Sequence, residues 1–242
     1  MSEAASSQSA VSDPEISQPE ISLPAMSPGH RSRLARLHAL TGAVPLAGFL
    51  LLHLVTQASA LGGWQRHRGV SRFIDAVPGV LALEILCVYL PLVTHVVLGL
   101  ARTSGSEKPS SVGWVGRAGR TLQQASGAIL LAFLCFHGWQ FRWRLWAGEI
   151  APADMFPELC ASLSSTSFGG VPVIAVAYLV GIAAGSLHAA QGVYHVCCEW
   201  HMVSPERQSF LGRLCVAGGT GLFLLGASIV IELATGSVVI RL

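Results

Sequence analysis

Charged side chains are scarce in this sequence, and their scarcity excludes several classes of protein. Asp, Glu, Lys and Arg make up 12% of its 242 residues, roughly half the share of an average soluble domain. The formal net charge is only +2, so the chain offers no strongly basic face and we expect no nucleic-acid partner. Hydrophobic residues make up 52%, and the few charges lie in short clusters between long apolar runs. This distribution indicates a protein that crosses a membrane several times, because an ionisable group in hydrocarbon is costly.

The chain also lacks the sequence motifs of several common cofactors. It has no G-x-G-x-x-G fingerprint for a flavin, and its six cysteines include no cluster spaced for an iron–sulfur centre. The absence of C-x-x-C-H excludes the ordinary covalent attachment of a c-type haem. Cys160 alone falls in an outer loop, so we predict no disulfide framework. The chain is therefore not expected to bind a flavin or an iron–sulfur cluster by itself.

The first thirty residues differ in composition from the rest of the chain. Residues 1–30 are rich in Ser, Pro and acidic residues and contain no apolar run, which predicts a disordered tail. They also lack the basic start and apolar stretch of a secretory signal. Residues 31–242 are then expected to form a single membrane domain.

Five apolar segments predict an all-α fold with five membrane-spanning helices. A helix needs about 20 apolar residues to cross a bilayer, and five segments satisfy this length: 40–61, 80–101, 122–141, 171–196 and 211–235. Lys and Arg number nine in the connections on the N-terminal side and six on the other. This bias predicts a cytoplasmic N-terminus and, after five crossings, an outside C-terminus.

Each of the first four spans contains one histidine well inside it: His53, His95, His137 and His188. A single intramembrane histidine could simply bond a backbone carbonyl, but one in each of four helices favours a shared function. A rise of 1.5 Å per residue in helices of alternating direction sets their depths. His53 and His137 then share an outer layer, and His95 and His188 share an inner one.

Two histidines at one level on facing helices can bind haem iron from opposite sides. The four helices would thus enclose two stacked haem groups. Small residues near the histidines leave room for a flat macrocycle: Gly127, Gly185, Ala189, Ala190 and Gly192. Isolated zinc or copper fits less well, because two histidines per layer leave zinc short of ligands. His38 and His195 are rival ligands for the inner layer, and a haem-free transporter or structural anchor is the alternative of a different class.

The residues around these histidines resemble the cytochrome b subunit of succinate:quinone oxidoreductase, of the type with two haems in one five-helix anchor. The resemblance covers about residues 31–200. It is carried by Arg36-Leu37-His38, Gly42, Pro45, Phe49-Leu50 and His53-Leu54; by Ala82-Leu83-Glu84-Ile85, Leu90-Pro91-Leu92, His95 and Gly99; by Leu122-Gln123, Ser126-Gly127 and His137-Gly138-Trp139-Gln140-Phe141-Arg142; and by Leu187-His188 with Gly192.

The resemblance implies a bacterial cytoplasmic-membrane subunit of respiratory complex II, in the tricarboxylic acid cycle. Such a subunit anchors a flavoprotein and an iron–sulfur protein among membrane lipids and does not oxidise succinate by itself. Electrons would pass through two b haems to menaquinone, with His95 and His188 on the proximal haem and His53 and His137 on the distal one. Ser186 stands where some fumarate-reducing members have a glutamate, which favours succinate oxidation. The runner-up is a dihaem cytochrome b of another quinone-linked enzyme.

Two further sets of residues are expected around the haems and the quinone. Asp75, in the predicted outer loop, is the expected proton relay for quinone, with Glu84 and Glu232 as competing acids. An N-cap or a turn residue before the second span is the structural alternative for Asp75. Donors to the inner haem propionates are expected from Arg36, His38, Gln123 and Ser126. His30, His67 and His201 are interpreted as solvated loop residues.

Overall fold

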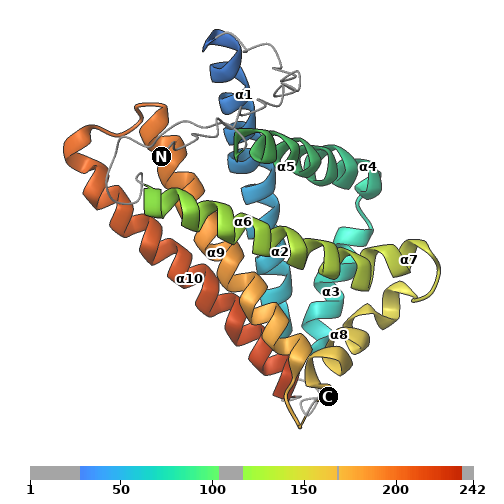
Figure 1. Cartoon of the computed structure of the whole chain (residues 1–242). Helices are drawn as coiled ribbons and strands as arrows, with labels where there is room; N and C mark the ends of the chain where they lie inside the picture. Colours follow the sequence, from blue (N-terminus) through green and yellow to red (C-terminus); the bar gives the residue numbers. More distant parts are fainter. Residues whose placement is uncertain (1–27, 104–116, 168, 236–242) are drawn as a thin grey trace, which may run out of the picture.

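The computed structural model describes residues 28–103, 117–167 and 169–235 (Figure 1). Within these ranges, regular structure is helical apart from one isolated bridge between Ser167 and Val171. The all-α prediction is therefore confirmed. Most of the predicted tail lies outside the described residues, and its last three residues already belong to the first helix.

The first predicted span is part of a longer, continuous helix. It is built from α1 (Pro28–Thr41), a π-helical stretch (Gly42–Leu46), α2 (Ala47–Ala58) and a 3-10 turn (Ser59–Gly62). The π-helical stretch contains Pro45. Because proline has no backbone N–H to donate, the wider turns absorb it without ending the helix.

Three more long helices follow the predicted spans, and each also extends beyond its apolar run. The second consists of α4 (Val80–Glu84), a π-helical stretch (Ile85–Tyr89) and α5 (Leu90–Thr103). The third consists of α6 (Arg117–Gly138), a π-helical stretch (Trp139–Trp143) and α7 (Arg144–Trp146). The fourth is α9 (Val173–Glu199).

A short 3-10 turn (Pro205–Arg207) leads into α10 (Gln208–Thr235), which completes the set of five long helices in the described part of the chain. Four of the five are long and apolar enough to cross a membrane: Arg33–Gly62, Val80–Arg102, Val173–Glu199 and Pro205–Thr235. Large apolar side chains lie exposed on them, with Leu52, Leu86 and Leu224 each 60% exposed or slightly more. Such outward-facing apolar residues suit contact with lipid.

The predicted third span, 122–141, is helical but is not among those four. Gln123, Gln124 and His137 dilute its apolar residues, which explains the lower hydropathy. At 22 residues, α6 alone is long enough to cross a bilayer. A fifth crossing stays a prediction.

Two short helices, absent from the sequence prediction, lie between the long ones: α3 (Trp64–Asp75) and α8 (Met155–Ser164). They contact each other through Phe156, whose ring centre lies 4.9 Å from that of Trp64 and 4.7 Å from that of His67. His67 is only 7% exposed, so its interpretation as a solvated loop residue was wrong. Burial lowers the pKa of His67 below its ordinary value, and a backbone hydrogen bond involving Thr56 partly offsets the shift.

Helix α9 is central to the packing, with α6 on one side and α10 on the other (Figure 1). Glycine allows α10 to approach closely, because a Cβ at Gly219 would lie 2.9 Å from the Cβ of Ala190 and 3.2 Å from the carbonyl oxygen of Ser186. Helix α1 packs separately against α5. Ala190, predicted to flank a macrocycle, instead lies at this helix–helix contact.

Candidate functional site

The predicted outer pair of histidines meets between α2 and α6. The ring centres of His53 and His137 are 5.9 Å apart, with their planes at 75°. Phe49 stacks on His53 at 5.5 Å, and Phe133 stacks on His137 at 5.6 Å. The two imidazoles therefore meet edge to face, with an aromatic ring stacked on each.

The outer pair has one polar neighbour that sequence reasoning missed. Tyr178 of α9 places its hydroxyl 3.0 Å from Nδ1 of His137 and donates a hydrogen bond of 2.8 Å to Oε1 of Gln140. Tyr178 is 6% exposed and Gln140 is 5% exposed. No sequence pattern predicts this contact, because it depends on the crossing of α6 and α9.

The predicted inner pair meets between α5 and α9. The ring centres of His95 and His188 are 6.2 Å apart, with their planes at 85°. Both rings lie against bare glycine backbone. A Cβ at Gly42 would lie 2.6 Å from Cε1 of His95, and a Cβ at Gly127 would lie 2.9 Å from Cε1 of His188.

His38 belongs to this inner layer as well. Its ring stacks on that of His95 with centres 4.0 Å apart and planes within 14°. Nδ1 of His38 lies 3.0 Å from the carbonyl oxygen of His95, and Nδ1 of His95 lies 2.9 Å from that of His38. A carbonyl oxygen only accepts, so both imidazoles donate through Nδ1. This reciprocal pair joins α1 to α5 and leaves Nε2 of each ring with its lone pair.

Gln123 and Ser126 of α6 are gathered around His188. Nδ1 of His188 donates to the carbonyl oxygen of Gln123 at 3.2 Å, and the Gln123 amide donates to that of His188 at 3.3 Å. The Ser126 hydroxyl lies 3.5 Å from Nδ1 of His188. Oε1 of Gln123 is buried without a hydrogen-bond partner.

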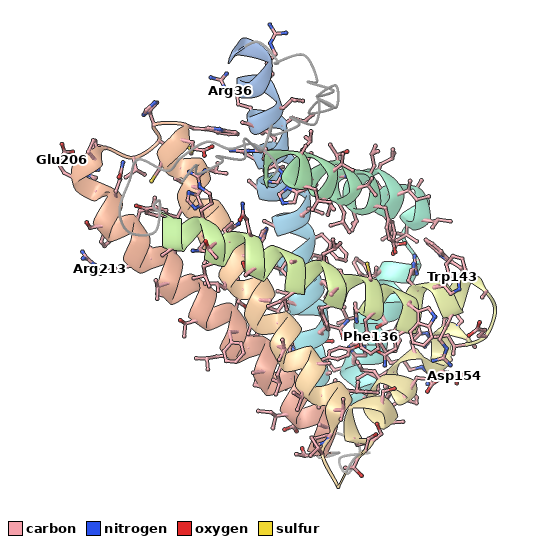
Figure 2. All side chains as sticks on the ribbon, viewed as in Figure 1. Arg36, Phe136, Trp143, Asp154, Glu206 and Arg213 are labelled. Carbon is pink, nitrogen blue, oxygen red and sulfur yellow. The ribbon has the colours of Figure 1, made fainter. Side chains whose placement is uncertain are left out.

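Arg36 is exposed on the part of α1 that projects beyond the other helices (Figure 2). Propionate contacts of these residues stay predictions.

Two of the candidate acids for quinone chemistry lie on α3 and α4, the helices before and at the start of the second span. Asp75 is the last residue of α3, not part of a loop, and its side chain lies outside the described residues. Asp75 is not the N-cap of the second span, because α4 begins at Val80 with Gly79 as its N-cap. The turn that separates α3 from α4 follows directly after Asp75. Glu84 forms an ion pair with Arg142, whose guanidinium also lies 5.6 Å from the centre of the Trp146 ring. The Glu84 carboxylate is thus already paired with the Arg142 guanidinium.

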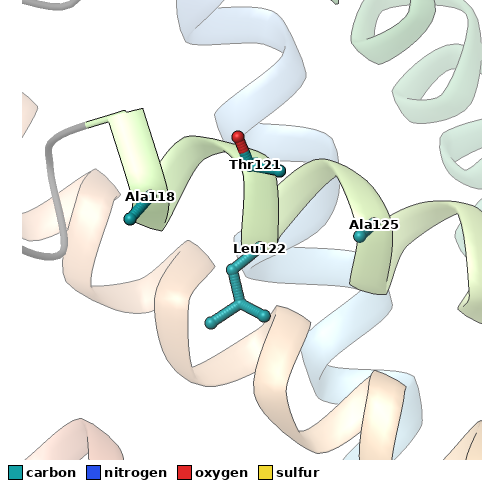
Figure 3. A pocket seen from close by; sticks show the side chains of 4 residues that line it. All are labelled: Ala118, Thr121, Leu122 and Ala125. Atoms are coloured by element: carbon teal, nitrogen blue, oxygen red, sulfur yellow. The ribbon is translucent and has the colours of Figure 1, made fainter.

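A groove on α6 is lined by no acidic or basic side chain. It is lined by Ala118, Thr121, Leu122 and Ala125, one stripe along the helix (Figure 3). None of these side chains is charged, and three are apolar. The groove therefore suits contact with lipid better than a reaction.

The two histidine pairs can bind only a metal that brings further ligands of its own. Among the described residues, no group of three or more His, Cys, Asp or Glu side chains could hold a bare metal ion. Two imidazole nitrogens, each about 2 Å from a shared metal, would put the ring centres roughly 6 Å apart. Each pair, with ring centres 5.9 and 6.2 Å apart, therefore suits a metal that would bring a macrocycle as its other ligand. Haem iron is such a metal.

Comparison with known proteins gives one informative match. Over 189 residues, the chain is 28% identical to the succinate dehydrogenase cytochrome b558 subunit of Bacillus subtilis (strain 168). The match covers 76% of this chain and 87% of that protein. No family model and no solved structure matches the chain. The predicted resemblance to cytochrome b subunits of succinate dehydrogenase is confirmed.

Proposed function

We propose that this chain is the cytochrome b membrane anchor of a bacterial succinate dehydrogenase. It would pass electrons from an iron–sulfur subunit through two b haems to menaquinone, while a flavoprotein partner oxidises succinate. The observation that carries the proposal is the meeting of four histidines from four helices as two pairs, with ring centres 5.9 and 6.2 Å apart. The match to the Bacillus subtilis subunit, with its modest identity, gives independent support.

Each layer has a distinct set of supporting residues. His53 and His137 would hold the outer haem, where Phe49 and Phe133 stack on the imidazoles. His95 and His188 would hold the inner haem, and their Nδ1 atoms donate to backbone carbonyls. When bound, haem iron supplies reversible one-electron transfer. The residues of the chain hold and orient it, and the N-terminus would face the cytoplasm with the partner subunits.

Haem analysis of the purified complex tests the proposal. We expect two b haems for each copy of this chain, measured as the pyridine haemochrome. Replacing His53 or His137 with alanine should remove one haem, and replacing His95 or His188 should remove the other, as reduced-minus-oxidised spectra would show. His201→Ala is the matched control, because His201 is exposed outside the helices, and both haems should remain. A haem-free complex, or loss of the same haem from the His53 and His95 variants, would refute the proposal.

The quinone is expected beside the outer haem, at the far end of the electron path from the iron–sulfur subunit. Asp75 is the proposed proton relay there. Asp75→Asn should lower quinone-linked turnover while both haem spectra and the reduction of an artificial dye by the partner subunits are unchanged. Asp154→Asn is the control, since Asp154 is an exposed acid outside the long helices. If Asp75→Asn leaves quinone turnover unchanged, the relay lies elsewhere, and Glu84 or Glu232 should be tested.

A further inference from the structure

The hydroxyl of Tyr178 determines which nitrogen of His137 carries the proton. A tyrosine hydroxyl has one proton, and this one is donated to Oε1 of Gln140, which can only accept. The 3.0 Å contact between the hydroxyl oxygen and Nδ1 of His137 must then be donated by the imidazole. His137 is thereby held as the Nδ1–H tautomer, with the lone pair on Nε2.

The same contacts restrict the orientation of the His137 ring. The Tyr178 ring meets it edge-on, with centres 5.6 Å apart and planes at 82°. Phe133 stacks on the His137 imidazole with planes within 18°, and Phe141 meets it at 60° with centres 5.6 Å apart. Rotation of the imidazole would break the hydrogen bond to Tyr178 and disturb this packing.

The inner layer uses a different kind of support. Nδ1 of His95 and Nδ1 of His188 donate to the backbone carbonyls of His38 and Gln123. Those backbone acceptors stay in place whatever side chain is present at positions 38 and 123. His188 also has the Ser126 hydroxyl 3.5 Å from its Nδ1 but keeps a backbone acceptor. The Nδ1 contact of His137 is instead with the Tyr178 hydroxyl, a side-chain group that substitution can remove.

We propose that Tyr178, supported by Gln140, is a positioning residue that fixes the tautomer and orientation of His137 for the outer haem. This rests on the proposed function. An acceptor on Nδ1–H raises the basicity of a ligating imidazole, and loss of such a partner typically weakens metal binding by about 10–100-fold. A more basic ligand stabilises the oxidised iron, so Tyr178 should hold the midpoint potential of the outer haem below the value it would otherwise have.

The test is Tyr178→Phe in the full complex, with redox titration of each haem. We expect an upward shift in the midpoint potential of the outer haem, a change in its low-spin signal, and easier loss of that haem on dilution. The inner haem should be unchanged. Tyr194→Phe is the matched control, since Tyr194 lies on the same helix near its inner end and is 8% exposed. It should leave the outer haem unchanged.

Gln140→Met covers the case in which Tyr178→Phe fails to assemble. It keeps the tyrosine but removes the acceptor, so the hydroxyl proton is free to turn toward Nδ1 and favour the wrong tautomer. It should also raise the midpoint potential of the outer haem or weaken its binding. If the wild-type complex holds two haems and these variants leave the outer haem unaltered, Tyr178 has no positioning role. A haem-free wild-type complex would instead remove the proposed function itself.

Discussion

On the proposed function, Gly42→Ala should remove the inner haem while the outer one remains. Gly42 lies in the first long helix against His95 of α5, and a Cβ there would lie 2.6 Å from Cε1 and 2.9 Å from Nδ1 of that ring. Carbon atoms pack best at about 3.5–4.0 Å. The imidazole must therefore move by roughly 1 Å, or the two helices must separate by a similar distance.

Such a shift cannot be absorbed by a harmless rotation of the ring. His95 is held by the stacked ring of His38 at 4.0 Å and by its donation to the carbonyl oxygen of His38 at 2.9 Å. A movement of this size is about half the length of a metal–nitrogen bond, which is enough to break ligation. Gly127→Ala acts on the partner ligand His188, where the Cβ contact is 2.9 Å, and should weaken the same haem to a smaller degree.

Gly48→Ala is the matched control, because Gly48 lies on the same continuous helix and has nothing within 4 Å of its added Cβ. The assay is the haem content of the purified complex, combined with reduced-minus-oxidised spectra that separate the two haems. We expect about one haem per chain for Gly42→Ala and two for Gly48→Ala. Retention of both haems with unaltered spectra in Gly42→Ala would refute the packing argument. Loss of the outer haem instead would refute the division into layers.

Two further predictions concern the N-terminal tail and helix α3. Deletion of residues 2–28 should leave haem content and complex assembly intact, since that segment has too few apolar residues to bury; loss of the partner subunits during purification would contradict this. His67 is buried in its neutral form, so its folded-state pKa lies below the ordinary value of about 6.5. Its contribution to stability is therefore complete above about pH 6.5 and is lost as the pH falls toward the folded-state pKa. Hydrogen exchange of α3 amides, corrected for intrinsic rates, should increase below pH 6.5, and His67→Phe should remove that dependence; an unaltered acid response in the variant would show that another group is responsible.

The long helices could be predicted from the sequence because hydrocarbon demands apolar runs of a fixed length. The ends of these helices could not be predicted in the same way, because polar residues can extend a helix beyond the apolar segment into water. The first span was predicted over 40–61, whereas helix extends from Pro28 to Gly62. The apolar run marks only the part of a helix that suits lipid.

The two short helices are amphipathic and contain no long apolar run, so a criterion based on such runs does not predict them. Trp64, His67, Val70 and Ile74 recur at intervals of three and four along α3, which is a helical signal. The same holds for Phe156, Cys160 and Leu163 of α8, all buried. The spacing of three and four residues therefore predicts both helices.

The pairing of the four histidines could be predicted because depth follows directly from the rise of a helix. Depth fixes the level of each imidazole but not its neighbours around the helix axis. The stack of His38 on His95, the ion pair of Glu84 with Arg142 and the contact of Tyr178 with His137 depend on crossing angles and rotations. Those are set by packing between residues far apart in the chain.

The division of ligands between the two halves of the chain has a consequence for biogenesis. His53 and His95 lie before residue 104, and His137 and His188 lie after residue 116, yet each pair takes one member from each half. On the proposed function, the first helical hairpin leaves the ribosome with half of each site, and His95 already braced by His38. Neither site is complete until the later helices are inserted, the inner one last, when α9 arrives. Haem, ligated by one histidine from each half, would then join two halves that are inserted one after the other. A cell short of haem would accumulate the haem-free subunit, which would be exposed to quality-control proteolysis.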